Sequence, residues 1–267
     1  MSKKVAVLGL GASGLFAAKA AKDCGCEVTA YTLSKEITFP PGPFWLHWIP
    51  ENVQDKFELT PIFHIGKGTA SNYQALQWGR LPKRKFSNSF PAKNKHHYGY
   101  NPTEVLPTFV PEDIKVLSKL LTDADIGELA EEYDVVFQTF ATDLSKQQQL
   151  AFLPYTMASQ FDLEDAKTNY VIYNGTKKGI IVREIQLWHN KFLEFPKYLP
   201  IKEIRKGTPL SNFQVQTLWD LDPFAKLWRQ PSDANKKICL VGRWAEWNKD
   251  RLSHDAYAIA QRRIQNG

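Results

Sequence analysis

The sequence has little cysteine. Only three of its 267 residues are cysteine, namely Cys24, Cys26 and Cys239. A single glycine separates the first two, which is too short a spacing for an unstrained disulfide, and no further cluster of Cys and His lies near them to complete a zinc site. A small, odd number of cysteines fits a reducing compartment. We therefore predict neither a disulfide framework nor a bound metal.

The chain also lacks a pattern typical of a signal peptide or a membrane span. It starts Met-Ser-Lys-Lys and passes directly into a strand-like run, without a cleavage region of small residues. No apolar run reaches the roughly 20 residues that a membrane helix needs. We expect a cytoplasmic protein with no membrane partner.

Charge of neither sign dominates. Lys and Arg number 34 against 28 Asp and Glu, which gives a formal net charge of +6, and 43% of the residues are hydrophobic. This composition is typical of a globular protein with one large domain or two modest ones. A modest positive field attracts anions such as a pyrophosphate, a nucleotide sugar or nucleic acid, but the same excess also occurs on ordinary solvated surfaces.

The clearest motif lies at the start of the chain. The apolar run VAVL at 5–8 predicts a strand buried on both faces of a parallel sheet, and GLGASG follows at 9–14. An Ala-rich helix is predicted for 15–22 and a second strand for 27–31. A G-x-G-x-x-G sequence between a strand and a helix, with a second strand at this distance, is typical of a dinucleotide-binding βαβ unit.

Each glycine of the motif has its own physical role. Gly9 allows the tight turn from strand to helix, Gly11 lets the backbone approach a pyrophosphate, and Gly14 lets the helix pack closely on the strand. The start of the helix presents free N–H groups to phosphates, and Ala12 and Ser13 lie between the glycines just before it. We predict that these five residues form the pyrophosphate site.

The acidic residue that usually ends the second strand and binds the ribose hydroxyls is missing. Its place falls at Tyr31 or Thr32, which we take as the candidates on the ribose side. Thr32 or Ser34 can hydrogen-bond a ribose, whereas Lys35 can face a phosphate, which would suit NADP. The motif alone leaves the kind of dinucleotide open.

Two segments after this unit are rich in aromatic residues. Residues 39–48 combine proline and glycine with Phe and Trp, which predicts a loop that covers a flat ligand or the core, and His47 within it is a catalytic candidate. Basic and aromatic residues alternate over 66–100. Its 80–97 loop would either contact nucleic acid or form a solvated part of a substrate domain.

The remaining sequence predicts further helices and strands. Helices are expected at 111–121 and 125–132, followed by a buried strand at 133–140. Two β-branched runs around the Asn-Gly pair at 174–175 predict an antiparallel hairpin, and Arg183 in its second strand is another catalytic candidate.

The end of the chain repeats the pattern of its beginning. A strand at 237–241 is followed by Gly242 and Arg243, and a helix is predicted at 254–264. The start of that helix would provide a second positive helix end that stabilises negative charge.

Three segments together resemble FAD-dependent oxidoreductases of the amine-oxidase and UDP-galactopyranose-mutase superfamily: VAVLGLGASG, YDVVFQTFA and ICLVGRWAEWNKDRLSHDAYAIA. The resemblance implies an α/β fold with a Rossmann-like, FAD-binding parallel sheet and a smaller antiparallel-sheet substrate domain. It implies an FAD domain of residues 1–56, 110–145 and 236–267, and a substrate domain of residues 57–109 and 146–235. Compact relatives of this kind are often encoded by phages, and the compartment would then be the host cytoplasm.

The resemblance also implies FAD as the cofactor. Gly242 and Arg243 would lie beside the flavin, and His254 and Asp255 would approach its pyrimidine edge. The implied enzyme oxidises an amine or amino-acid-like substrate, in one variant linked to a nucleotide or to DNA, by hydride transfer to flavin N5. The alternatives are a mutase-like, non-redox flavoenzyme acting on a nucleotide sugar, and a non-catalytic FAD-, NAD(P)- or nucleic-acid-binding protein.

Overall fold

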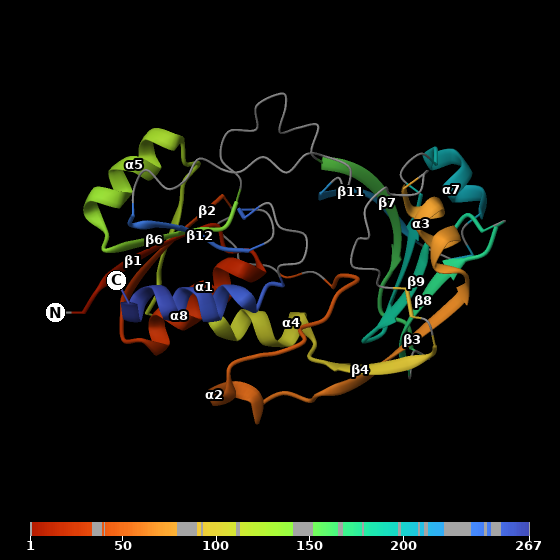
Figure 1. Ribbon diagram of the computed structural model, residues 1–267, viewed down its shortest axis with the longest axis horizontal. Helices are drawn as coiled ribbons and strands as arrows, with labels where there is room; N and C mark the ends of the chain where they lie inside the picture. The colour runs from red at the N-terminus through yellow and green to blue at the C-terminus, as the bar shows by residue number, and fades with distance from the viewer. Residues whose placement is uncertain are drawn as a thin grey trace.

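The computed structural model shows two β-sheets side by side, each with helices packed against it (Figure 1). Both chain ends lie at the same sheet. The structure describes residues 2–33, 39, 41–78, 90–91, 93–110, 113–140, 152–164, 168–177, 179–196, 199–207, 209–210, 213–221, 236–242, 245–246 and 252–266.

The first sheet has five parallel strands in the order β12-β6-β1-β2-β5. Their bounds are β1 Lys4–Leu8, β2 Glu27–Thr32, β5 Lys115–Ser118, β6 Val135–Gln138 and β12 Ile238–Leu240. Strands β2 and β5 lie on one side of β1, and strands β6 and β12, which come later in the chain, lie on its other side. The strand order therefore reverses between β1 and β6, and ligands of such sheets bind at the carboxyl ends of the strands at this switch point.

Helices cover both faces of this sheet because successive side chains of β1 point to opposite sides. Val5 and Val7 pack with residues of α1 and α8, whereas Ala6 and Leu8 pack with residues of α5. In Figure 1, α1 and α8 lie together below the sheet and α5 lies above it. The helices are α1 Ala12–Asp23, α2 Glu51–Gln54, α4 Pro102–Val105, the 3-10 helix η1 Leu106–Phe109, α5 Asp123–Glu132 and α8 Asp255–Asn266. Although α4 and η1 come from the 57–109 segment, they pack on the α1 side.

The second sheet has seven strands in the order β11-β7-β10-β9-β8-β3-β4. Its strands are β3 Thr60–Gly68, β4 Lys95–Gly99, β7 Phe152–Gln160, β8 Asn169–Gly175, β9 Arg183–Leu187, β10 Asn190–Phe195 and β11 Gln214–Leu221, with helices α3 Ala70–Trp78 and α7 Ile201–Gly207. The sheet is mixed, because β3 and β8 run parallel while the other pairs run antiparallel. The predicted α/β fold class, with a Rossmann-like parallel sheet and a separate second sheet, is confirmed, whereas the second sheet was expected to be smaller and antiparallel and is instead mixed with seven strands.

The helix predicted at 111–121 is wrong over all of its described residues, 113–121: none of them is helical, and residues 115–118 form β5 at the edge of the parallel sheet. Val116 packs against the core on the α1 side of the sheet, and Leu117 packs against the core on the α5 side. Pairing with β2 and burial on both faces therefore outweigh the local helical pattern.

The antiparallel pairing predicted for the strands on either side of 174–175 is confirmed between β8 and β9, but the tight turn predicted at 174–175 is wrong. Strand β8 continues to Gly175, which pairs with Gly68 of β3, and the connection to β9 is longer. A Cβ on Gly68 would lie 2.2 Å from the carbonyl oxygen of Gly175. A Cβ on Gly175 itself would lie 2.1 Å from the carbonyl oxygen of Thr69, so Gly175 is needed for the close approach of two chain segments rather than for a tight turn.

Some expectations fall outside the described residues. They are those for Ser34, Lys35 and Arg243, and for most of the basic 80–97 loop, of which residues 90–91 and 93–97 are described. Of the helices that the structure describes, none combines the length and apolar character needed to cross a membrane.

Candidate functional site

Helix α1 begins directly behind the carboxyl end of β1. Gly11 precedes its first turn, no described side chain caps it, and the turn contains no acidic residue. The first N–H groups of an α-helix have no partner within the helix, and the helix dipole adds partial positive charge there. The start of α1 is thus suited to binding an anion.

The three glycines of the motif shape the space around this helix end. Gly9 has a φ of 88°, in the left-handed region that favours glycine. A Cβ on Gly14 would lie 1.9 Å from the carbonyl oxygen of Gly9, whereas a Cβ on Gly11 would meet no atom within 4 Å. The turn at Gly9 and the close packing at Gly14 are therefore observed, and Gly11 borders open space. Contact between Gly11 and a ligand stays a prediction.

Thr139 connects the end of β6 to the same turn. Its Oγ1 donates a hydrogen bond to the carbonyl oxygen of Leu8 at 2.7 Å, and a Cβ on Gly9 would lie 2.5 Å from that Oγ1. Thr139 therefore helps to hold the turn of Gly9 at the switch point. Thr139 was not predicted from the sequence, although a hydroxyl directly after a buried strand could have indicated it.

The end of the chain returns to the start of α1. Gly242 follows β12 with a φ of 92°, and a Cβ placed on it would lie 2.3 Å from the Oγ of Ser13. Glu246, also missed from the sequence, accepts a hydrogen bond from the N–H of Gly242 at 3.0 Å. The structure thus brings together Ser13 and Gly242, two of the predicted site residues.

The start of α8 adds a second helix end. The Oδ2 of Asp255 accepts a hydrogen bond from the N–H of Leu252 at 2.8 Å, so this carboxylate is engaged at the start of its own helix. The ring centroid of His254 lies 6.3 Å from that of His47 and 6.1 Å from that of Trp48. His254 and His47, which are far apart in the sequence, therefore belong to one group of rings.

Desolvation and the nearby charges of His254 and His97 lower the pKa of His47. Burial also lowers the pKa of His254, although the carboxylate of Asp255 opposes that effect. Both rings are therefore mainly neutral at pH 7, because an unperturbed histidine already titrates near 6.5.

Tyr31 takes a different place from the one expected. Its side chain is 7% exposed, and its hydroxyl lies 3.1 Å from that of Tyr133. We correct its expected role: the ring fills the core on the α5 side and its hydroxyl already has a partner. The half-buried Thr32 remains the candidate at the end of β2.

Arg183 also differs from the expectation, because its guanidinium forms an ion pair with the buried carboxylate of Glu194. Its positive charge also acts on the hydroxyl of Tyr173. Its charge is thus paired within the second sheet, and a catalytic role for Arg183 stays a prediction.

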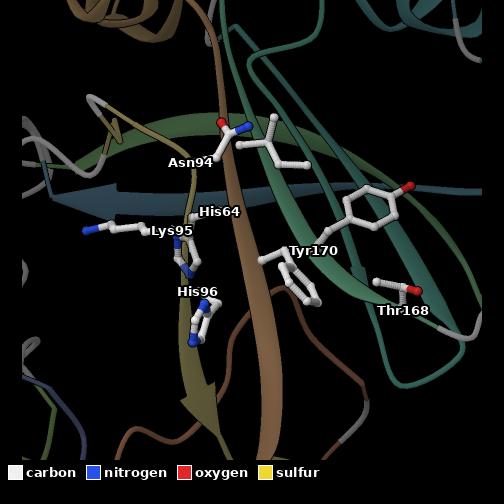
Figure 2. A pocket seen from close by; sticks show the side chains of 8 residues that line it. His64, Asn94, Lys95, His96, Thr168 and Tyr170 are labelled. Atoms are coloured by element: carbon white, nitrogen blue, oxygen red, sulfur yellow. The ribbon is translucent and has the colours of Figure 1, made fainter.

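A pocket of about 400 Å³ lies on the second sheet, away from α1. Figure 2 shows Lys95 and His96 on one side of it and Thr168 and Tyr170 on the other. Its lining consists of Phe63, His64, Ile65, Asn94, Lys95, His96, Thr168 and Tyr170. This group was not predicted from the sequence, because its residues come from three strands and the segments beside them.

No protein-family model matches the sequence, and no curated protein matches it. Several solved structures are similar in fold. The tryptophan 6-halogenase SttH from Streptomyces toxytricini aligns with a TM-score of 0.54 at 10% identity over 99% of this chain and 72% of that chain. The 2,6-dihydroxypyridine-3-hydroxylase from Arthrobacter nicotinovorans aligns with a TM-score of 0.52 at 14% identity over 100% of this chain and 85% of that chain. The flavin-dependent halogenase CmlS aligns with a TM-score of 0.50 at 16% identity, over 98% of this chain and 56% of that chain. At these identities, the chain shares the fold of these proteins.

Proposed function

We propose that this chain binds FAD and is a flavin-dependent oxidoreductase. The proposal rests mainly on the close contact between Gly242 and Ser13 at the uncapped start of α1. Both ends of the chain thereby border one site at the point where the strand order reverses. The fold shared with a flavin-dependent halogenase supports a flavin over a nicotinamide.

The residues of the site fit the parts of this cofactor. The N–H groups at the start of α1 would hold the pyrophosphate, and Gly11 leaves the space that a phosphate needs for close approach. Thr32 would face the adenosine side, whereas Gly242 and the start of α8 would lie towards the flavin. When bound, FAD would supply hydride or electron transfer, which the protein's side chains do not provide themselves.

The finer expectation of amine or amino-acid oxidation stays a prediction, as does a substrate linked to a nucleotide or DNA. The mutase-like alternative required arginines that clamp a diphosphate, and the ion pair of Arg183 with Glu194 does not favour it. The non-catalytic alternative has no described feature in its favour. We therefore propose the general class of reaction and leave the substrate to experiment.

The test is the absorbance spectrum of the purified chain, with the released cofactor identified by mass. We expect a yellow protein with a flavin band at roughly 450 nm and one FAD per chain. A colourless protein that binds NADPH but takes up no added FAD would contradict the proposal. Peroxide release with a panel of amines then tests the finer expectation.

A further inference from the structure

A second polar site lies at the second sheet, separate from the residues proposed to hold the cofactor. His64 of β3 is 5% exposed, and its Nε2 has no hydrogen-bond partner among the described residues. The Nε1 of Trp45 is likewise buried without a partner in that part of the chain. The two rings lie nearly perpendicular in a T-shaped arrangement, with their centroids 5.3 Å apart and an angle of 81° between their planes. Because buried polar atoms nearly always have a partner, two such atoms on neighbouring rings suggest the place of a ligand.

A row of polar side chains fixes which nitrogen of His64 carries the proton. Glu194 accepts a hydrogen bond from Arg183, and the positive charge of Arg183 also acts on the hydroxyl of Tyr173. That hydroxyl lies 3.1 Å from Nδ1 of His64. Since a positive charge attracts the hydroxyl oxygen and repels its proton, the proton of Tyr173 is directed to His64, whose Nδ1 accepts it. A neutral imidazole that accepts at Nδ1 carries its own proton on Nε2.

Burial, with the charges of His97, Lys95 and His47, lowers the pKa of His64 to about 4. The ring is therefore neutral at pH 7 and keeps the tautomer that Tyr173 imposes. An indole N–H is always a donor. Both unpartnered atoms, on His64 and on Trp45, are thus hydrogen-bond donors, and each needs an acceptor.

The surroundings are basic and aromatic. The ring of His97 lies 4.7 Å from that of His64, and Lys95 pairs with His64 across β3 and β4. Within the described chain no group of His, Cys, Asp and Glu is arranged to hold a metal ion. The ring of His47 lies between two others: its centroid is 5.3 Å from that of Trp45 and 6.3 Å from that of His254, just before α8.

We propose that His64 and Trp45 bind an anionic oxygen, such as a carboxylate or a phenolate, of an aromatic substrate. Their two N–H groups satisfy the oxygen, and the rings of Trp45 and His47 provide flat contacts for an aromatic body. Tyr173 and Arg183 act as positioning residues, because they fix the proton on His64 without meeting the ligand. That the anion is the substrate rests on the proposed flavin function, whereas the anion site itself does not.

The test is binding of phenylacetate to the full-length protein, compared with the neutral phenylacetamide. We expect the carboxylate to bind at least about tenfold more tightly than the amide and to shift the ¹H–¹⁵N signals of Trp45 Nε1 and His64 Nε2. His64→Phe and Trp45→Phe should each weaken phenylacetate about tenfold. His64→Gln, which keeps a side-chain N–H, should recover part of the loss.

Two further variants separate a binding role from a structural one. Tyr173→Phe should weaken binding and change the ¹⁵N shifts of His64 towards a mixture of tautomers. His96→Phe is the matched control, because His96 lies on the same strand pair but points to the opposite face, against Phe63 and Tyr98. It should leave phenylacetate binding unchanged. Equal affinity of the wild type and a folded His64→Phe variant would overturn the inference, as would equal binding of carboxylate and amide.

Flavin content separates this inference from the proposed function. A yellow wild type whose phenylacetate binding does not depend on His64 overturns the anion site alone. A colourless wild type that still binds phenylacetate through His64 overturns the flavin function and leaves the anion site standing. We expect His64→Phe to keep its band at roughly 450 nm while losing the anion.

Discussion

Ser13 and Gly242 touch with no room for another atom between them: a Cβ on Gly242 would lie 2.3 Å from the Oγ of Ser13 and 2.6 Å from its Cβ. Because Gly242 also has a φ of 92°, the site requires a glycine for two separate reasons. The last strand of the parallel sheet and its first helix are thereby tied to one another at the proposed cofactor site.

This contact predicts that Gly242→Ala lowers both stability and cofactor retention. A side chain in the left-handed region costs about 1–2 kcal/mol, and the new Cβ would push the start of α1 away. Gly25→Ala is the control, because Gly25 has a φ of 74° but open space around its Cβ position. Denaturant unfolding should show a loss in both variants, whereas FAD affinity should fall only in Gly242→Ala. Equal flavin retention in the two would contradict our assignment of Gly242.

A second pair of glycine variants separates binding from folding. Gly11→Ala meets no atom within 4 Å, so the chain should fold with nearly its normal stability. The added methyl group would occupy the space of the pyrophosphate and weaken FAD by at least about tenfold, or 1.4 kcal/mol. Gly14→Ala, 1.9 Å from the carbonyl oxygen of Gly9, should instead lose about 1–3 kcal/mol of stability. Flavin titration and urea unfolding of both variants test this, and unchanged FAD affinity in Gly11→Ala would argue against a phosphate at that position.

The bond between Tyr31 and Tyr133 predicts a structural effect only. Burial and this bond raise the pKa of Tyr31. Tyr31→Phe or Tyr133→Phe should each cost about 1 kcal/mol of unfolding free energy, and the double variant should cost less than the sum. FAD affinity should stay at its wild-type value. A Tyr31→Phe variant with normal stability and weakened FAD would instead restore Tyr31 as a cofactor residue.

The lowered pKa of His64 predicts that the folded protein loses stability in acid. Its pKa is about 4 in the folded chain and about 6.5 when unfolded, so the unfolded chain binds more protons between these pH values. Stability is therefore full above about pH 6.5 and falls as the pH drops towards 4. His64 accounts for at most about 3 kcal/mol of this fall.

His47, His97 and His254 have pKa values shifted in the same direction and add to the slope. The contribution of His64 is thus read from the difference between the wild type and His64→Phe in denaturant unfolding at pH 7, 5 and 4. We expect a shallower fall in that variant and the wild-type fall in His96→Phe. Parallel profiles for the wild type and His64→Phe would show that the ring is not buried as a neutral group.

Much of the first βαβ unit follows from the sequence, because its determinants are local. The turn at Gly9 and the helix packing at Gly14 depend on residues within six positions of one another, and the strands carry continuous apolar runs. The return of Gly242 to this unit was expected only through a resemblance. Strand β5 was missed, because a strand of four residues at a sheet edge is determined by its partner β2 rather than by its own pattern.

The roles of the polar side chains were decided by tertiary structure. The fold places the hydroxyl of Tyr31 beside that of Tyr133 in the core, and it pairs the charge of Arg183 with that of Glu194. No functional role was predicted for His64 from the sequence, yet the fold buries its ring beside Trp45, and its Nε2 has no hydrogen-bond partner among the described residues. A glycine turn is encoded by backbone conformation within a few residues, whereas the chemistry of a buried polar group depends on partners that only the folded chain brings within reach.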